Sequence, residues 1–236
     1  MLVAPFIGSF LGVLIRRLPA RRPVGLARSA CETCGAPLGP WEMLPVLSYA
    51  MLRGRCRHCA GPIAPFHWQI ELAATMVALS AIMADPARIW ADCAFGWTLL
   101  ALAWIDITHF RLPDVLTLPL ILAGFAEGWW EYPALAADRA GAAVIGYAAF
   151  RGVALGYRWL RGRDGLGEGD AKLLAALGAW VGLVGLSDVL LDAALLGLAA
   201  AAVLRVRGRS MTATTALPFG ACLAAAGWLV RLYANP

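Results

Sequence analysis

The sequence predicts an all-α polytopic membrane protein with a small cytosolic zinc-binding domain inserted after the first membrane span. Of its 236 residues, 61% are hydrophobic and only 15% are charged, which excludes an ordinary soluble domain. The apolar residues gather in long runs, and the basic residues fall between them. The net charge of +5 therefore indicates membrane topology, with the lipid bilayer rather than nucleic acid as the partner.

The apolar runs predict about eight transmembrane helices. The first is the short run Leu2–Ile15, and the others cover residues 68–84, 89–105, 114–130, 139–160, 170–187, 189–204 and 217–233. This pattern predicts three parts of the chain: a first span at residues 1–15, a cytosolic domain at residues 16–66 and a membrane domain at residues 67–236.

Arginine placement predicts the topology. Arg16 and Arg17 directly follow the first span, so we expect the N-terminus outside. Alternating the spans then puts residues 16–66, 106–113, 161–169 and 205–216 in the cytosol, which are the segments where arginine gathers. Glu127, Asp138, Arg139 and Arg231 are expected near the outer face. Asp106 and Asp170, at the ends of two different spans, are expected at the same cytosolic face.

Four cysteines in the cytosolic segment form two C-x-x-C pairs, Cys31-Glu-Thr-Cys34 and Cys56-Arg-His-Cys59. Two such knuckles suit tetrahedral zinc, and four protein ligands leave no open position, so the zinc is expected to be structural. The alternative, two disulfides, requires an oxidising compartment. His58 could replace a thiolate, but we interpret it as a solvated loop residue.

Two aspartates are candidates for catalysis. Alone, Asp170 is explained as a helix N-cap and Asp106 as a helix-end acid that faces water. Together at one membrane face, two close carboxylates cannot easily both ionise, so one can act as a base toward water while the other donates a proton to a carbonyl oxygen. Gly167 and Gly169 are expected to let the backbone turn tightly and bring substrate close to Asp170.

Three neighbouring polar residues have more than one interpretation. Lys172 either tunes the pKa of the aspartate pair or extends its ammonium group to the membrane surface. Asp114, directly after Pro113, is interpreted as a helix cap, and His109 as a solvated loop residue with proton shuttling as the alternative.

The ordered motifs of this chain resemble those of the type IV prepilin peptidases, membrane aspartic peptidases of the GxGD kind. They include Gly8-Ser-Phe-Leu11, both C-x-x-C pairs, Pro45-Val-Leu-Ser-Tyr49, Ile105-Asp106, Leu112-Pro-Asp114, Gly167-Glu-Gly-Asp170 with Lys172, and Pro218-Phe-Gly220. The match runs through nearly the whole chain.

The resemblance implies that Asp106 and Asp170 are the catalytic pair. It implies a prepilin or pseudopilin substrate, cut after a glycine at the cytosolic face of a bacterial inner membrane. It also implies a second activity, methylation of the new N-terminus from S-adenosylmethionine.

Two other functions fit some of the same residues. An ion- or proton-coupled transporter would use Asp106 and Asp170 near mid-membrane, whereas these acids are expected at span ends. A non-enzymatic scaffold would bind a partner through its zinc module, and its function would survive single aspartate substitutions.

Overall fold

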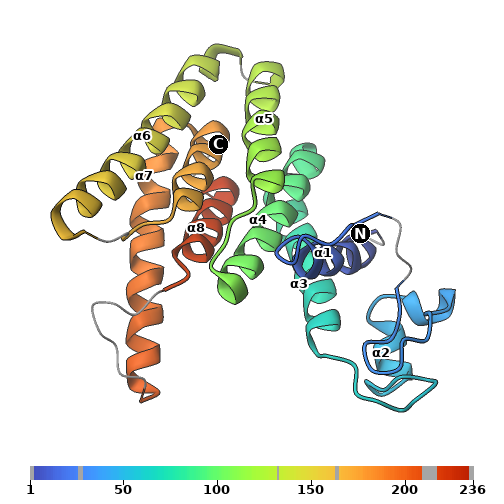
Figure 1. The fold of residues 1–236 in the computed structure, drawn as a ribbon. Helices are drawn as coiled ribbons and strands as arrows, with labels where there is room; N and C mark the ends of the chain where they lie inside the picture. The colour runs from blue at the N-terminus through green and yellow to red at the C-terminus, as the bar shows by residue number, and fades with distance from the viewer. Residues whose placement is uncertain (1–2, 26–28, 132, 163–164, 209–216, 234–236) are drawn as a thin grey trace. The chain divides into compact units, whose positions relative to one another are not determined.

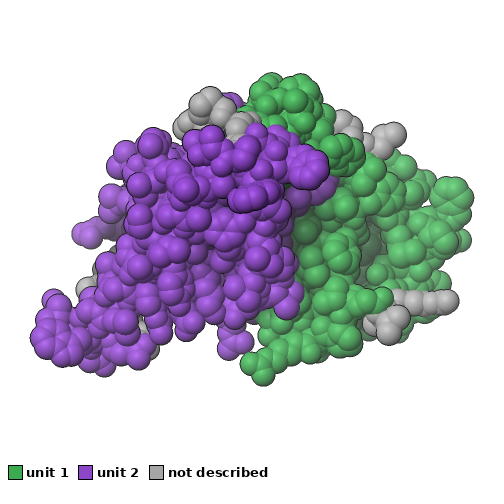
Figure 2. All heavy atoms as spheres, turned by 90° about the horizontal axis from the view of Figure 1, so that it is seen from above, with its two compact units in different colours: residues 1–93 green, residues 94–236 purple. Residues whose placement is uncertain are grey.

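The computed structural model describes residues 3–25, 29–131, 133–162, 165–208 and 217–233. Over these ranges the chain is helical and has no strand, only two isolated β-bridges, which confirms the all-α expectation. It divides into two compact units, residues 1–93 and residues 94–236 (Figures 1 and 2). Residues 1–2 of the predicted first span and residues 209–216 of the predicted last cytosolic segment lie outside the described ranges.

The first unit pairs α1 (Ala4–Arg17) with α3 (Phe66–Ala84). A Cβ atom at Gly8 would lie only 2.6 Å from the Cα atom of Glu71, so the two helix backbones touch at this point. Small residues at such crossings permit close helix packing in membranes. The two cysteine knuckles belong to the segment of the chain that connects these two helices.

Two short helices connect the knuckles of the first unit. They are η1 (Pro40–Met43) and α2 (Leu47–Met51). The chain then leaves α3 at Asp85, whose carboxylate accepts a hydrogen bond from the backbone N–H of Ala87 at 2.9 Å and so caps η2 (Pro86–Arg88).

The second unit holds most of α4 and all later helices. Their bounds are α4 (Ile89–His109), α5 (Asp114–Glu131), η3 (Pro133–Leu135), α6 (Ala136–Arg161), α7 (Glu168–Val206) and α8 (Phe219–Tyr233). The helix α6 ends where Gly162 adopts the left-handed conformation with φ 68°, as glycine does at helix C-termini. The helix α7 packs against α5, α6 and α8.

The chain of α7 reverses at Gly182, which has φ 72° and ψ −174°. Before this residue, α7 runs in the same direction as α8, because Leu177 meets Gly227 and, further along both helices, Trp180 meets Arg231. After it, α7 runs back, so that Gly197 approaches Phe219 at the start of α8. The helix α7 is therefore a helical hairpin, visible as two separate ribbons in Figure 1.

Four helical segments are long and apolar enough to cross a membrane within the described residues. They are Phe66–Ala84, Pro86–His109, Pro133–Arg161 and Glu168–Val206. The shorter α1 has 14 residues and α8 has 15, while the 18-residue α5 carries three acids. The predicted number of eight membrane spans is therefore not confirmed.

The two predicted spans at 170–187 and 189–204 both lie in α7, with the break at Gly182 rather than beside Asp188. Asp188 is exposed and is tolerated within a helix, whereas the reversal requires a positive φ that glycine adopts without strain.

Candidate active site and metal site

Asp106 lies in the last turn of α4, and its side chain is buried. Its carboxylate accepts hydrogen bonds from the first backbone N–H groups of α8. The N–H of Ala221 donates to Oδ2 at 3.0 Å, and that of Gly220 also donates to the carboxylate. The N–H of Ala221 also lies 3.2 Å from the carbonyl of Pro218, just before the helix, so Asp106 adds a second acceptor and helps to cap α8 across 115 residues of sequence.

Asp170 lies in the first turn of α7, three residues after the N-cap residue Gly167. Its carboxylate accepts a hydrogen bond from the backbone N–H of Gly167, which is one half of a capping box. Asp170 therefore helps to cap α7, as the sequence suggested, but it does so from the first turn of the helix, because the N-cap residue is Gly167. Gly167 has φ −71°, which any residue adopts, but a Cβ atom there would lie 3.2 Å from Oδ2 of Asp170.

The side chain of Leu112 lies between the surroundings of the two acids, because it packs against Gly169, next to Asp170, and against Gly220 of α8, whose N–H binds Asp106. A Cβ atom at Gly169 would lie 2.9 Å from Cβ of Leu112, and one at Gly220 would lie 2.9 Å from Cδ1 of Leu112. The same Cβ atom at Gly220 would lie 2.9 Å from Oδ2 of Asp106. Both glycines therefore admit Leu112, and the two carboxylates lie close enough for the charge of Asp106 to act on Asp170.

Lys172 links the start of α5 to the start of α7. Its Nζ donates hydrogen bonds to Oδ1 and Oδ2 of Asp114 at 2.9 and 3.0 Å, and lies 3.3 Å from Oε1 of Glu168. This arrangement favours a positioning role over a solvated lysine, because it fixes the turn that carries Asp170. His109 is exposed, and its Nδ1 lies 2.7 Å from the hydroxyl of Thr108.

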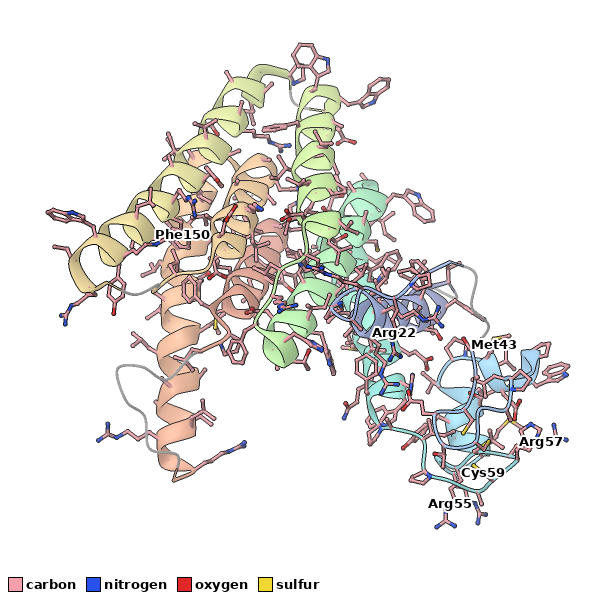
Figure 3. The ribbon with its side chains drawn as sticks, viewed as in Figure 1. Arg22, Met43, Arg55, Arg57, Cys59 and Phe150 are labelled. Atoms are coloured by element: carbon pink, nitrogen blue, oxygen red, sulfur yellow. The ribbon has the colours of Figure 1, made fainter. Side chains whose placement is uncertain are left out.

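The two cysteine knuckles share one backbone pattern. In the first, the N–H of Cys31 donates to the carbonyl of Ala36 at 2.8 Å. In the second, the N–H of Cys56 donates to the carbonyl of Gly61, also at 2.8 Å. Each knuckle is closed by an isolated β-bridge, Ala30 with Pro37 and Arg55 with Pro62. Figure 3 shows Arg55 and Arg57 beside Cys59 in the second knuckle.

The four sulfur atoms of Cys31, Cys34, Cys56 and Cys59 lie within 4.8 Å of one another, and the cysteines are free thiols. Sγ of Cys31 and Sγ of Cys59 are 3.9 Å apart. Four sulfurs around one tetrahedral zinc, each about 2.3 Å from it, are separated by about 3.8 Å. The cysteines are thus positioned to bind a metal ion, and His58 is not part of the cluster.

Electrostatics in the cluster also favour a cation. The backbone N–H groups of Cys34 and Thr33 lower the pKa of the Cys31 thiol to about 6. At Cys59 the N–H of Gly61 acts in the same direction, but burial and the neighbouring thiols outweigh it and raise the pKa to about 11. Adjacent sulfurs oppose each other's ionisation, and a divalent cation would allow all four to become thiolates.

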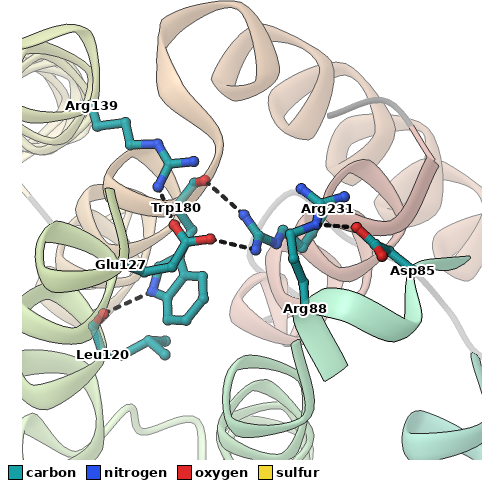
Figure 4. A network of polar contacts seen from close by, with 7 residues as sticks. All are labelled: Asp85, Arg88, Leu120, Glu127, Arg139, Trp180 and Arg231. Atoms are coloured by element: carbon teal, nitrogen blue, oxygen red, sulfur yellow. Dashed lines mark hydrogen bonds and ion pairs between the residues drawn. The ribbon is translucent and has the colours of Figure 1, made fainter. Parts of the chain in front are cut away.

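A buried ionic network lies where α7 reverses (Figure 4). Oε1 of Glu127 accepts a hydrogen bond from Nη2 of Arg231 at 2.7 Å, and Oε2 is bound by Nη1 of Arg139. Nη1 of Arg231 lies 3.5 Å from the carbonyl of Trp180, two residues before the reversal, and its guanidinium lies over the Trp180 ring. All three charged side chains are less than a tenth exposed.

The other side of the reversal is held by Asp138. Its Oδ2 accepts a hydrogen bond from the N–H of Leu183 at 3.0 Å, a group that the break at Gly182 leaves without its partner inside the helix. The sequence placed Asp138, Glu127, Arg139 and Arg231 near one membrane face but gave no sign that they bond to one another.

Sequence reasoning also missed Leu112 and Gly220 as neighbours of the acids. Both belong to motifs that carried the family resemblance, Leu112-Pro-Asp114 and Pro218-Phe-Gly220. Their positions in those motifs were the available signal, but their contacts join segments that are far apart in the chain.

Two family models match the chain. Residues 2–84 match the bacterial peptidase A24 N-terminal domain, and residues 93–202 match the type IV leader peptidase family. No solved structure matches the chain significantly.

Curated relatives cover almost the whole chain. A prepilin leader peptidase/N-methyltransferase of Burkholderia pseudomallei is 40% identical over 98% of this chain and 83% of its own length. Proteins of the same name from Pseudomonas aeruginosa and Aeromonas hydrophila are 35% and 34% identical, over 100% and 97% of this chain and 89% and 88% of their own lengths. The chain therefore belongs to the type IV leader peptidase family.

Proposed function

We propose that this protein is an aspartic endopeptidase of the bacterial inner membrane, with Asp106 and Asp170 as its catalytic pair. It removes the basic leader from a type IV prepilin or pseudopilin after a glycine at the cytosolic face. Family membership supports the peptidase activity and the substrate class. One observation carries the assignment of the pair: Leu112 packs against Gly169, the residue before Asp170, and against Gly220, whose backbone N–H binds Asp106.

The chemistry follows from two interacting carboxylates. The ionised one takes a proton from a water molecule, whose oxygen then bonds to the scissile carbonyl carbon, while the protonated one donates to the carbonyl oxygen. When the tetrahedral intermediate collapses, the C–N bond breaks and the leaving amine takes the proton that the first carboxylate had accepted from water, while the proton of the hydroxyl group returns to the other carboxylate. Because Oδ2 of Asp106 accepts the N–H of Ala221, the start of α8 fixes the orientation of that carboxylate.

The Cys31, Cys34, Cys56 and Cys59 cluster is proposed to hold a structural zinc ion, which the sulfur spacing fits. A bound zinc would stabilise the four thiolates and join the two knuckles. It would take no part in peptide hydrolysis, because four protein ligands leave no position for water.

We also propose that all eight predicted spans cross the bilayer, with the two arms of α7 as separate spans. The reversal at Gly182 supports this, because it returns the chain toward the face from which the first arm started. Asp106 and Asp170 then lie at the cytosolic face.

A second activity is proposed from the printed name of the relatives, which includes N-methyltransferase. This protein would methylate the amine released by cleavage, with S-adenosylmethionine as the methyl donor.

One experiment tests both activities. Membranes containing the protein are incubated with a prepilin and S-adenosylmethionine, and the pilin is analysed by mass spectrometry. The account expects loss of the leader up to a glycine, followed by the added mass of a methyl group. An intact prepilin, with the protein folded and several prepilins tested, would favour the transporter or scaffold functions.

A further inference from the structure

The first unit contains a buried carboxylate that the peptidase mechanism does not use. Glu71 lies in α3 and is 8% exposed. Its Oε2 accepts the backbone N–H of Val46 at 2.7 Å, and its carboxylate also accepts a hydrogen bond from the side chain of Ser9. Among the described residues it makes no ion pair. A buried carboxylate without a cation is costly, and acids inside membrane helices usually mark functional sites.

The surroundings of Glu71 are built closely around it. Gly8 of α1 packs against the backbone of α3 at Glu71, and the next residue, Ser9, supplies one of its hydrogen bonds. Gly8 thus lets the two helix backbones meet at Glu71, and Ser9 binds the carboxylate itself. A glutamate that only filled space between two apolar helices would not require the hydrogen bond from Ser9.

The residue that donates to Glu71 has a strained backbone. Val46 has φ 60° and ψ −46°, a conformation that β-branched residues rarely adopt. Strain of this kind costs on the order of 1–3 kcal/mol and occurs often at functional sites, where the surrounding structure maintains it. Here the strained peptide aims the N–H of Val46 at the Glu71 carboxylate.

We propose that Glu71 binds the N-terminal ammonium group that leader cleavage creates and takes its proton for methyl transfer. The inference rests on the proposed peptidase and methyltransferase activities, because the peptidase supplies this amine. An ammonium group is the cation that the buried carboxylate lacks, and it can donate up to three hydrogen bonds.

The proton must leave before the methyl group arrives, because an ammonium nitrogen has no lone pair. The carboxylate of Glu71 takes one proton and leaves a neutral amine. The nitrogen lone pair then forms a bond to the methyl carbon of a sulfonium donor. The C–S bond breaks and its electron pair stays on sulfur, which becomes a neutral thioether.

The depth of Glu71 suits this substrate. It lies five residues into α3, about 8 Å along the helix from Phe66, where α3 begins after the predicted cytosolic domain. An amine released at the cytosolic membrane face would reach this depth without crossing the bilayer.

Other titratable groups on the elements packed around Glu71 are engaged elsewhere. On α1, Arg16 contacts Glu32 and lies 3.3 Å from His67 of α3, while Arg17 donates to the carbonyl of Pro23. On α2, the ring of Tyr49 lies beside that of Trp68. A pH effect that depends on Glu71 can therefore be separated from these groups by substituting Glu71 alone.

The first test measures binding without a methyl donor. The purified full-length protein is mixed with a labelled peptide of the mature pilin N-terminus, and with the same peptide lacking only its N-terminal amine. The wild type is expected to bind the amine-bearing peptide about 10-fold more tightly, as one charge-assisted interaction provides. Glu71→Gln keeps a hydrogen-bond acceptor for Val46 and Ser9 but removes the charge, so it should lose this preference.

Matched variants exclude a general disturbance of α3. Gln69→Ala changes an exposed side chain two residues away and should keep the preference. Ser9→Ala keeps the charge of Glu71 and should therefore keep most of the preference for the amine-bearing peptide. A Glu71→Gln protein that still prefers the free amine would overturn the proposal.

The second test measures methylation of pre-cleaved pilin. At pH 7, Glu71→Gln should reduce the rate about 100-fold, the usual effect of losing a general base. Between pH 7 and pH 9 the variant should recover roughly seven-fold, because the neutral fraction of an amine with pKa about 7.8 rises by that factor. A purely structural defect would give the same loss at both pH values and would contradict the proposal. Recovery of the Glu71→Gln rate at excess S-adenosylmethionine would also contradict it, because the defect would then lie in donor binding. A wild-type protein that does not methylate pre-cleaved pilin would contradict it as well.

Prepilin cleavage by the same variant separates this inference from the peptidase assignment. Glu71→Gln should remove the leader at the wild-type rate. Absence of cleavage by the wild type would instead refute the proposed peptidase.

Discussion

Gly220→Ala tests whether the start of α8 positions Asp106. The new Cβ atom would lie 2.9 Å from both Oδ2 of Asp106 and Cδ1 of Leu112, whereas ordinary contacts begin near 3.4 Å. The carboxylate, the leucine or the helix must therefore move by about 0.5 Å. A misplacement of 1 Å can cost about 100-fold in rate, so half of it corresponds to about 10-fold.

The assay is steady-state cleavage of a prepilin by protein in membranes, measured over a range of substrate concentrations. The turnover rate should fall about 10-fold with little change in KM, because the carboxylate moves while the substrate contacts remain. Alanine is the better helix former by up to about 1 kcal/mol, so the protein should not unfold for that reason.

Two further variants make this test specific. Leu112→Ala in the Gly220→Ala background removes one of the two close contacts and should restore part of the rate. Gly152→Ala in α6, where a Cβ atom meets nothing within 4 Å, should leave cleavage unchanged. Full activity of Gly220→Ala would refute the positioning of Asp106 by α8.

Three other perturbations follow from the structure. Arg231→Met should destabilise the second unit by about 3–5 kcal/mol, because it leaves part of the buried Glu127 charge uncompensated. Chemical denaturation in detergent measures the free energy of unfolding, and a loss below about 1 kcal/mol would contradict a stabilising role of the ionic network. Gly182→Ala forces a side chain onto a residue with φ 72° and against Asp138, so it should lower the thermal midpoint, unlike the open-site control Gly141→Ala. Cys31→Ser should reduce bound zinc, measured by elemental analysis, whereas Cys93→Ser should not; equal zinc in both variants would contradict the zinc assignment.

The sequence predicted features that depend on short spacing. Each C-x-x-C pair places two sulfurs in one turn, so both knuckles could be recognised without knowledge of the fold, and the structure brings the four cysteines together. The proposed pairing of Asp106 with Asp170 came from topology, because both acids were expected at one membrane face. Leu112 contacts Gly169, next to Asp170, and Gly220, whose N–H binds Asp106, and these contacts support the pairing.

Features formed by distant segments could not be predicted. The ion pair of Glu127 and Arg231 joins residues 104 positions apart, and each alone resembles a charge at a membrane surface. The sequence predicted the boundary between two spans at Asp188, whereas the chain reverses at Gly182. A polar residue indicates a span boundary, but one glycine among 25 does not. Glu71 lay unremarked within an apolar run, since its importance comes from its contacts with Ser9 and Val46.

Substitution of either aspartate tests whether Asp106 and Asp170 form the catalytic pair. Prepilin cleavage is measured for Asp106→Asn and Asp170→Asn, beside Asp188→Asn, which removes an exposed acid from the same helix as Asp170. Either catalytic substitution should lower the rate more than 1,000-fold in a folded protein, roughly the loss expected when half of a coupled acid–base pair is removed. The Asp188→Asn variant should cleave like the wild type. Substantial cleavage by Asp106→Asn or Asp170→Asn would contradict the proposed pair.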